Sequence, residues 1–255
     1  MAAQSSTVTE TFERFEFKYW APLRRVEQAL ALLDGFMKED EVAKQAGASQ
    51  VNTSLYFDSP HFTFLEQHVA SLPDRIKLRV RYYGEVPAGP TFFEIKRRQV
   101  AVVMKRRAIV PLELTRGWIH DFTQPLPVVN ETLEDFQYLA LRCQVEPKVL
   151  VRARRQAFRA VEPGVDVRVT VDREVMWQPP RGPEFLVPRE DRWRRIEGLG
   201  DPGPKALIEV KFRTDHPWWL GRVTQLLAPW RVSFSKYVAA ALAAREDPFF
   251  RFDAA

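Results

Sequence analysis

Apolar and charged residues alternate strictly in five segments of the chain, a pattern that predicts β-strands with one apolar and one charged face. These segments are residues 14–20, 76–84, 91–98, 165–175 and 205–213. Further strands are expected at 51–59 and 147–158, and a basic stretch at 102–110 follows the third alternating segment. Helical spacing predicts helices from Pro22 to near Gly35 and at 61–69, 130–143, 217–228 and 234–245. Residues 38–49 and 178–204 are expected to be loops, the latter with one short strand.

The order of these elements predicts a single α+β domain. Strand-sized segments outnumber helices and most connections are short, which favours antiparallel pairing with helices packed outside the sheet. No linker or internal repeat divides the chain. We therefore expect a flexible N-terminus at 1–11, one domain at 12–246 and a C-terminal tail at 247–255.

The charged faces of the strands are the most informative feature. Glu-x-Lys occurs three times on predicted strands, as Glu16–Lys18, Glu94–Lys96 and Glu209–Lys211. A sheet with one solvated face explains alternation alone. If the helices cover the aromatic faces instead, the charged faces must point inward, where they are costly without a partner of opposite charge. A sheet closed on itself would gather these side chains into a tunnel.

Such a basic tunnel would suit a polyanion. Its cations would neutralise a triphosphate chain, and its carboxylates could hold Mn²⁺ or Mg²⁺, which prefer oxygen ligands. Arginine supplies most of the positive charge, with 28 Arg against 10 Lys in 255 residues and a formal net charge of +5. Arginine grips phosphate in a bidentate manner, although a GC-rich genome also raises its frequency.

Composition excludes several other classes. One cysteine, Cys143, rules out an intramolecular disulfide framework, and the four histidines lack metal-ligand spacing. No run of 18 apolar residues and no secretory signal is visible, so we expect a soluble, cytoplasmic protein. The seven tryptophans form no stacking pattern, which argues against a nucleic-acid partner.

Eight motifs in a fixed order resemble a known family. They are FEFKYW, SLYFDS, KLRVRYYG, FFEIKRR, RARRQAF, VTVDREV, LIEVKF and FSKYVAA, spread over residues 12–243. This series is similar to the catalytic domain of the vacuolar transporter chaperone (VTC) family, polyphosphate polymerases of the triphosphate tunnel metalloenzyme superfamily. The resemblance implies a closed, eight-stranded antiparallel β-barrel. It also implies transfer of the γ-phosphate of ATP to polyphosphate with Mn²⁺ or Mg²⁺.

The resemblance also implies roles for individual residues. Its motifs match phosphate-contacting residues at Lys18, Arg79, Arg81, Lys96 and Lys236, and a metal ligand at Glu209. Shared faces add further candidates: Lys77, Lys105, Arg107 and Lys211 for substrate, and Glu16 and Glu94 for metal, with ion pairing equally open for Glu94. Asp172 is expected to orient an arginine. Within RARRQAF, alignment on its last three letters favours Arg155, whereas alternation pairs Arg152 with Arg154, so all three are candidates and a bulge is an alternative.

The sequence departs from the superfamily's pattern at one position, and two other functions remain open. The superfamily's Glu-x-Glu-x-Lys signature is Arg14-x-Glu16-x-Lys18 here, which suits the polymerase branch better than a two-metal hydrolase. A triphosphate hydrolase and a non-catalytic polyanion-binding module nevertheless remain alternatives. The membrane helices of eukaryotic members are not visible in this sequence, so we expect the protein either to release its product or to pass it to a separate membrane partner.

Overall fold

The computed structural model describes residues 15–45, 50–100, 102–180, 184, 186–196, 203–213 and 216–246. The segments 1–11 and 247–255, which the sequence separates from the domain, lie outside these described residues, and so does Arg14. Within the described part, no helix is both long enough and apolar enough to cross a lipid bilayer.

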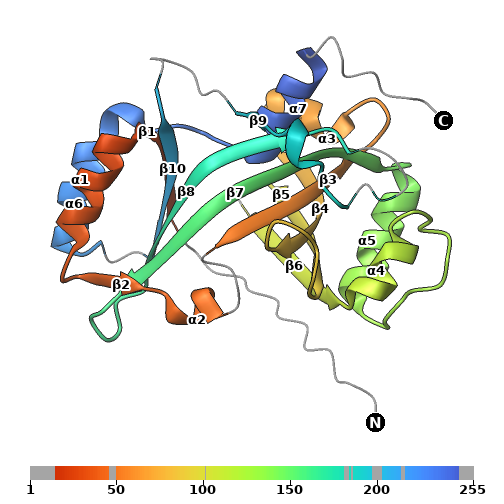
Figure 1. Ribbon diagram of the computed structural model, residues 1–255, viewed down its shortest axis with the longest axis horizontal. Coiled ribbons are helices and arrows are strands. Elements are labelled where there is room, and N and C mark those ends of the chain that lie inside the picture. Colours follow the sequence, from red (N-terminus) through yellow and green to blue (C-terminus); the bar gives the residue numbers. More distant parts are fainter. Residues whose placement is uncertain are drawn as a thin grey trace.

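The described strands form one antiparallel sheet (Figure 1). Eight follow the order β1-β10-β8-β7-β3-β4-β5-β6, while β2 pairs with β7 and β9 with β8. Their bounds are β1 Phe15–Pro22, β2 Met37–Glu39, β3 Val51–Asp58, β4 Asp74–Tyr83, β5 Thr91–Gln99, β6 Val102–Val110, β7 Glu146–Ala160, β8 Val167–Gln178, β9 Arg194–Arg195 and β10 Lys205–Phe212.

Seven described helices accompany this sheet, six of them in three pairs (Figure 1). They are α1 Leu23–Leu33, α2 Glu41–Gln45, α3 Thr63–Val69, α4 Leu112–Trp118, α5 Glu131–Arg142, α6 Trp218–Leu227 and α7 Lys236–Glu246, with 3₁₀ turns η1 Glu190–Arg192 and η2 Ala228–Trp230. The pair α1 and α6 lies beside β1 and β10, the pair α4 and α5 lies at the opposite side, and α3 lies next to α7.

The helices cover the apolar faces of the strands. Leu78, Val80 and Phe93 are fully buried and pack with Trp118 and Phe136 from α4 and α5. A second cluster joins the apolar side of β8 and β10 to α1 and α6. Because period-two alternation sends the charged side chains to the other face, these side chains point into the concave side of the sheet, as the sequence analysis predicts.

The predicted closed barrel is wrong. Among the described residues, β1 and β6 form the two ends of the strand order and do not pair with each other. The free edge of β1 is met instead by a distant segment, through a bridge between Tyr19 and Arg231 and a 2.9 Å hydrogen bond from the Val232 amide to the Lys18 carbonyl. Since those backbone groups of β1 are taken, the sheet curves around a cavity without closing.

The prediction that helices lie only outside the sheet is wrong for α7. Tyr56, Val151 and Ala153 line the concave cavity, and they also belong to the buried cluster that contains Ala240 and Ala241 of α7. Helix α7 therefore packs on the concave face, where it covers β7 and β8 at one end of the cavity.

Candidate functional site

A polar cavity of about 430 Å³ lies in the concave face of the sheet. All eight strands of the main strand order contribute to its wall. Twelve described side chains that line it are cationic and five are acidic: Lys18, Lys77, Arg79, Arg81, Lys96, Lys105, Arg107, Arg155, Arg159, Arg168, Lys211 and Lys236, against Glu16, Asp40, Glu94, Asp172 and Glu209. The excess of positive charge makes the cavity a strong site for polyanions.

Glu94 is the centre of a cationic group on β4, β5 and β6. Its side chain is 2% exposed and lies near Arg79 Nε at 2.5 Å, Arg107 Nη2 at 2.6 Å, Lys105 Nζ at 3.1 Å and Arg81 Nη2 at 3.8 Å. Burial raises the pKa of Glu94, but the four cations hold it well below the ordinary value. Three of these cations lie within 3.1 Å of its two oxygens, closer than any lysine lies to Glu209, where the shortest distance is 3.2 Å. This favours the ion-pairing role of Glu94 over the metal-binding one.

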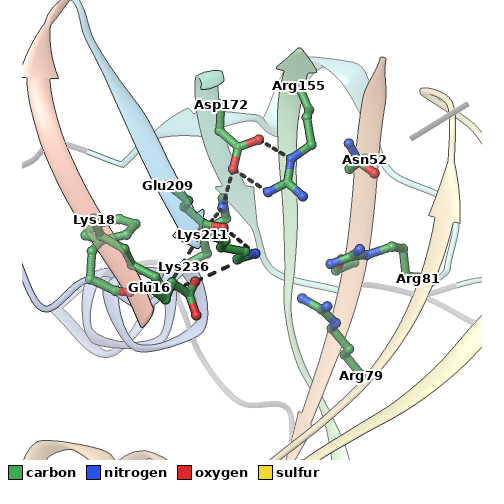
Figure 2. Close-up of polar contacts among 12 residues, drawn as sticks. Glu16, Lys18, Asn52, Arg79, Arg81, Arg155, Asp172, Glu209, Lys211 and Lys236 are labelled. Carbon is green, nitrogen blue, oxygen red and sulfur yellow. Dashed lines mark hydrogen bonds and ion pairs between the residues drawn. The ribbon is translucent and has the colours of Figure 1, made fainter. Parts of the chain in front are cut away.

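Arg81 has the weakest partners of this group. Its Nε donates to the Ser54 hydroxyl at 3.3 Å, and Glu94 is its only ion-pair partner among the described carboxylates. Burial and the neighbouring Arg79 both lower the pKa of Arg81. Arg79, in contrast, also donates to the Tyr56 hydroxyl at 3.0 Å. Within this group, Arg81 is thus the guanidinium with the most unmet charge, and it points into the cavity (Figure 2).

Asp172 positions two cations on the opposite wall (Figure 2). Its fully buried carboxylate accepts two hydrogen bonds from Arg155, at 2.6 and 2.7 Å, and an ion pair from Lys236. Burial raises the pKa of Asp172, but Arg155 and Lys236 lower it to about 2. The carboxylate is therefore ionised at neutral pH and orients Arg155, the role expected from the sequence.

Glu209 and Glu16 lie between lysines of β1, β10 and α7. Glu209, 7% exposed, has Lys211 at 3.2 Å and both Lys18 and Lys236 at 3.7 Å. Glu16 has Lys18 at 3.4 Å and Lys211 at 3.8 Å. Burial raises the pKa of Glu209, but the lysines hold it well below its ordinary value, so the group is a carboxylate at neutral pH.

A row of three lysines crosses β4, β5 and β6. Strand register places Lys77 opposite Lys96, and Lys96 opposite Lys105. Burial and the surrounding cations lower the pKa of Lys77 to about 7. Burial also lowers the pKa of Lys105 to about 7, against the opposing effect of Glu94. Like charges directly opposite one another destabilise a sheet, so an anion bound here would relieve the repulsion.

Helix α7 is anchored so that Lys236, its first residue, faces the cavity. The Tyr237 hydroxyl donates to Asp58, a buried carboxylate that also accepts amide hydrogen bonds from Phe64 and Leu65 at 2.8 and 2.9 Å. The Tyr237 ring stacks on Tyr56 at 5.1 Å. The positive N-terminus of α7 thereby adds to the cationic wall.

Two predicted substrate residues face away from the cavity. Arg152 contacts Glu190 at 2.9 Å and lies over the Trp193 ring at 4.4 Å, and Arg154 is more than half exposed, between Glu85 and Glu174. The register of β7 against β8 shifts between Arg152 and Arg154. Between these two positions β7 advances two residues and β8 three, so the extra residue lies on β8. Strand β7 keeps its alternation, and Val151, Ala153, Arg155 and Arg159 all line the cavity while Arg152 and Arg154 lie on the other face.

The remaining predicted site residues line the cavity, together with several that sequence reasoning missed. The missed ones are Asp40, Asn52, Tyr83, Arg159 and Arg168. Arg159 continues the face of Arg155 along β7, and Arg168 shares the face of Asp172, so alternation could have found both. Asp40 follows β2 in a segment predicted to be a loop, where no alternating pattern indicates which way a side chain faces.

The acidic residues fit a divalent ion only in part. No group of three or more His, Cys, Asp or Glu side chains within the described ranges could hold a metal ion. Glu209 and Glu16 nevertheless offer two ionised carboxylates on neighbouring strands. Mg²⁺ is typically bound by one or two carboxylates together with substrate phosphates. The pair therefore fits a metal whose remaining ligands are phosphate oxygens.

Comparisons with known proteins give one informative match. No curated protein matches the chain. A solved structure of a candidate adenylate cyclase from Bacillus halodurans aligns with 88% of this chain and 96% of its own length, at 10% identity and a TM-score of 0.49. A family model described as the VTC domain matches residues 13–244. Since this match covers nearly the whole chain, the protein belongs to the VTC domain family.

Proposed function

We propose that this protein is a polyphosphate polymerase that transfers the γ-phosphate of ATP to the end of a polyphosphate chain within the cavity. The observation that supports the proposal most directly is the convergence of cationic side chains from seven strands and α7 around one cavity. Membership of the VTC domain family is consistent with it. Phosphoryl transfer depends on positioning and charge stabilisation, which such a wall supplies.

In the proposed reaction, a terminal oxygen of polyphosphate attacks the γ-phosphorus of ATP. A new phosphoanhydride bond forms, the bond to the β-phosphate breaks, and ADP leaves with the bridging oxygen. The attacking oxygen is already ionised, so no general base is required. This agrees with the cavity carboxylates Glu94, Asp172 and Glu209, whose pKa values lie below their ordinary ones.

The chain's own residues would hold and align the phosphates. Arg81 and Arg79 would bind the triphosphate from β4, and Arg155, oriented by Asp172, would bind it from β7. Lys236, at the N-terminus of α7, would bind the triphosphate as well. Glu209 and Glu16 would hold Mn²⁺ or Mg²⁺, which supplies charge neutralisation at the phosphate oxygens.

One assay tests the proposal. Purified protein is incubated with ATP and Mn²⁺, and the products are separated on a gel stained for polyphosphate. A ladder of long chains together with ADP is expected. Orthophosphate or short phosphates without a ladder would indicate a hydrolase, and salt-sensitive binding without turnover would indicate a polyanion-binding module. Full activity in excess chelator would contradict the metal role.

Triphosphate binding is expected to weaken as the pH rises above about 7. Below the pKa of Lys77, about 7, this lysine is already charged, so affinity is insensitive to it. Above that pH, binding must be accompanied by proton uptake, because a bound anion raises the lysine pKa. Each such lysine then weakens binding by up to about tenfold per pH unit. Calorimetry with tripolyphosphate in buffers of different ionisation enthalpy measures both the affinity and the protons taken up.

The matched control for this pH dependence is Lys77→Arg combined with Lys105→Arg. Both guanidinium groups stay charged, so the affinity is expected to remain nearly constant across the same range. A wild-type affinity that is flat between about pH 7 and about pH 9 would contradict the expectation.

A further inference from the structure

The basic surface on β4 and β5 continues past the cavity. One step beyond the Lys77–Lys96 pair, strand register places Arg75 opposite Arg98. The step is two residues along each strand, roughly 6.6 Å, so the two arginines occupy the same face as the lysines. Neither arginine is among the residues that line the cavity. They therefore extend its cationic wall outward.

These outer cations form no ion pair with a described carboxylate, although Glu16 and Glu209 attract Lys96 from a greater distance. No described carboxylate lies within ion-pair distance of Lys77, Lys96, Arg75 or Arg98, although the Arg98 Nε donates to the Val100 carbonyl at 2.8 Å. Arg98 is exposed and Arg75 is half-buried. Two successive pairs of like charges directly opposite one another destabilise the free sheet, and a bound polyanion would remove that cost.

The other end of the strands differs. There, register places Arg159 opposite Arg168, but the buried carboxylate of Asp40 lies 3.4 and 3.6 Å from them. Strand β3 relates the two ends. Tyr56 of β3 pairs with Arg79 on β4 and with Val149 on β7, and Asn52 pairs with Tyr83 and Ala153. Residue numbers therefore rise in the same direction on β4 and β7. Arg75 on β4 and Arg159 on β7 thus lie at opposite ends of the sheet. Among the described cations of the concave face, those without an ion pair thus lie at the Arg75 end.

Helix α7 also lies at this end, but it covers the β7 and β8 side of the concave face. The β4 and β5 side carries the two pairs of cations. A chain that leaves the cavity between α7 and these strands would have Lys236 on one side and Lys77 and Lys96 on the other.

We propose that Arg75 and Arg98 form an outer subsite for long inorganic polyphosphate, which holds phosphates beyond those inside the cavity. The proposal rests on the proposed function and adds the end at which the chain emerges. A triphosphate fits within the cavity and does not reach this subsite. The two arginines therefore distinguish long chains from short ones.

The test compares two probes on one variant. The Arg75→Gln/Arg98→Gln double variant is titrated with inorganic tripolyphosphate and with long-chain inorganic polyphosphate of about 100 phosphates at moderate salt. The Kd for the long chain is expected to rise about tenfold or more, and its salt dependence to become shallower, because two phosphate contacts are lost. The Kd for tripolyphosphate is expected to stay within about twofold of wild type.

Three controls make the outcome decisive. Arg154→Gln/Arg192→Gln removes two exposed arginines elsewhere and is expected to leave both affinities unchanged. Arg75→Gln alone keeps the contact between Arg98 and Val100, and it is expected to show a smaller but still selective loss. Thermal unfolding of each variant confirms that the fold is retained.

The results separate the subsite from the proposed function. If the wild-type protein binds no long polyphosphate, both the proposed function and the subsite fail. The wild-type protein can instead bind and make long chains. If the double variant then keeps its affinity for both probes, or loses the same affinity for both, only the subsite is overturned. A selective loss for long chains in Arg159→Gln/Arg168→Gln, with none in the first variant, would place the emerging chain at the other end and also overturn the subsite.

Discussion

Replacing Arg81 by methionine is expected to lower kcat/KM for ATP by about 10²–10³-fold while leaving the ligand-free protein at least as stable as wild type. Arg81 lies in the cavity wall with one ion-pair partner, Glu94, at 3.8 Å. Methionine keeps the aliphatic stem and removes the charge. Glu94 retains three other cations, so no buried carboxylate is left unpaired.

The opposite signs of the two effects make this prediction specific. A guanidinium kept mainly for folding would lower both stability and activity when removed. Arg79→Met provides that comparison, because Arg79 contacts Glu94 at 2.5 Å and the Tyr56 hydroxyl at 3.0 Å, and its loss is expected to lower the melting temperature too. Arg154→Met, on the outer face, is the neutral control. Steady-state kinetics and thermal unfolding measure both effects, and an Arg81→Met enzyme with wild-type kcat/KM would contradict the role.

Alternation predicted which side chains of most strands face the cavity. Successive side chains of a strand point to opposite faces of the sheet, so once helices cover the apolar face, the charged side chains must lie on the other one. Arg79, Lys96 and Glu209 thus lie on the cavity, each on a different strand. The family resemblance, carried by eight short motifs over residues 12–243, is confirmed by the match over 13–244. Roles for single residues inside the cavity stay predictions.

Alternation alone did not show which face of β7 lines the cavity. Val151 and Ala153 face it because α7 packs on them, so the basic face with Arg152 and Arg154 is the outer one, and Arg155 shares the face of the apolar residues. Short elements were missed for a different reason. Strand β2 and helix α2 are too brief for their periodicity to exceed that of a loop. Helix α4 was also missed, although it is as long as the predicted helix α3.

Closure of the sheet could not be predicted because it depends on contacts between distant segments. Whether β1 pairs with β6 is decided by the segment at 231–232, which follows β1 by more than 200 residues and occupies its free edge. Periodicity likewise did not place α7 on the concave face, although the family resemblance matches Lys236 to a lysine on a terminal helix that closes on the phosphate chain. The buried positions of α7 include three alanines, Ala240, Ala241 and Ala244, whose small side chains give little amphipathic contrast.

Replacing Glu209 by glutamine is expected to lower kcat by about 10²-fold or more. The carboxylate lies among Lys18, Lys211 and Lys236, and its depressed pKa keeps it charged. Glutamine preserves its size but removes both the negative charge and a metal ligand. The metal concentration that gives half-maximal activity is therefore expected to rise as kcat falls.

The same substitution leaves three lysines without their shared counter-ion, which predicts tighter binding of tripolyphosphate in the absence of metal. Charge removal thus strengthens binding of the free anion while weakening turnover, a split that general unfolding would not produce. Glu190→Gln, on an exposed carboxylate paired with Arg152, is the matched control and should change neither quantity. An unchanged kcat and metal dependence in Glu209→Gln would remove Glu209 from the proposed metal site. Weaker metal-free binding would show that Glu209 does not offset the lysines, and that the cavity's affinity for anions has another source.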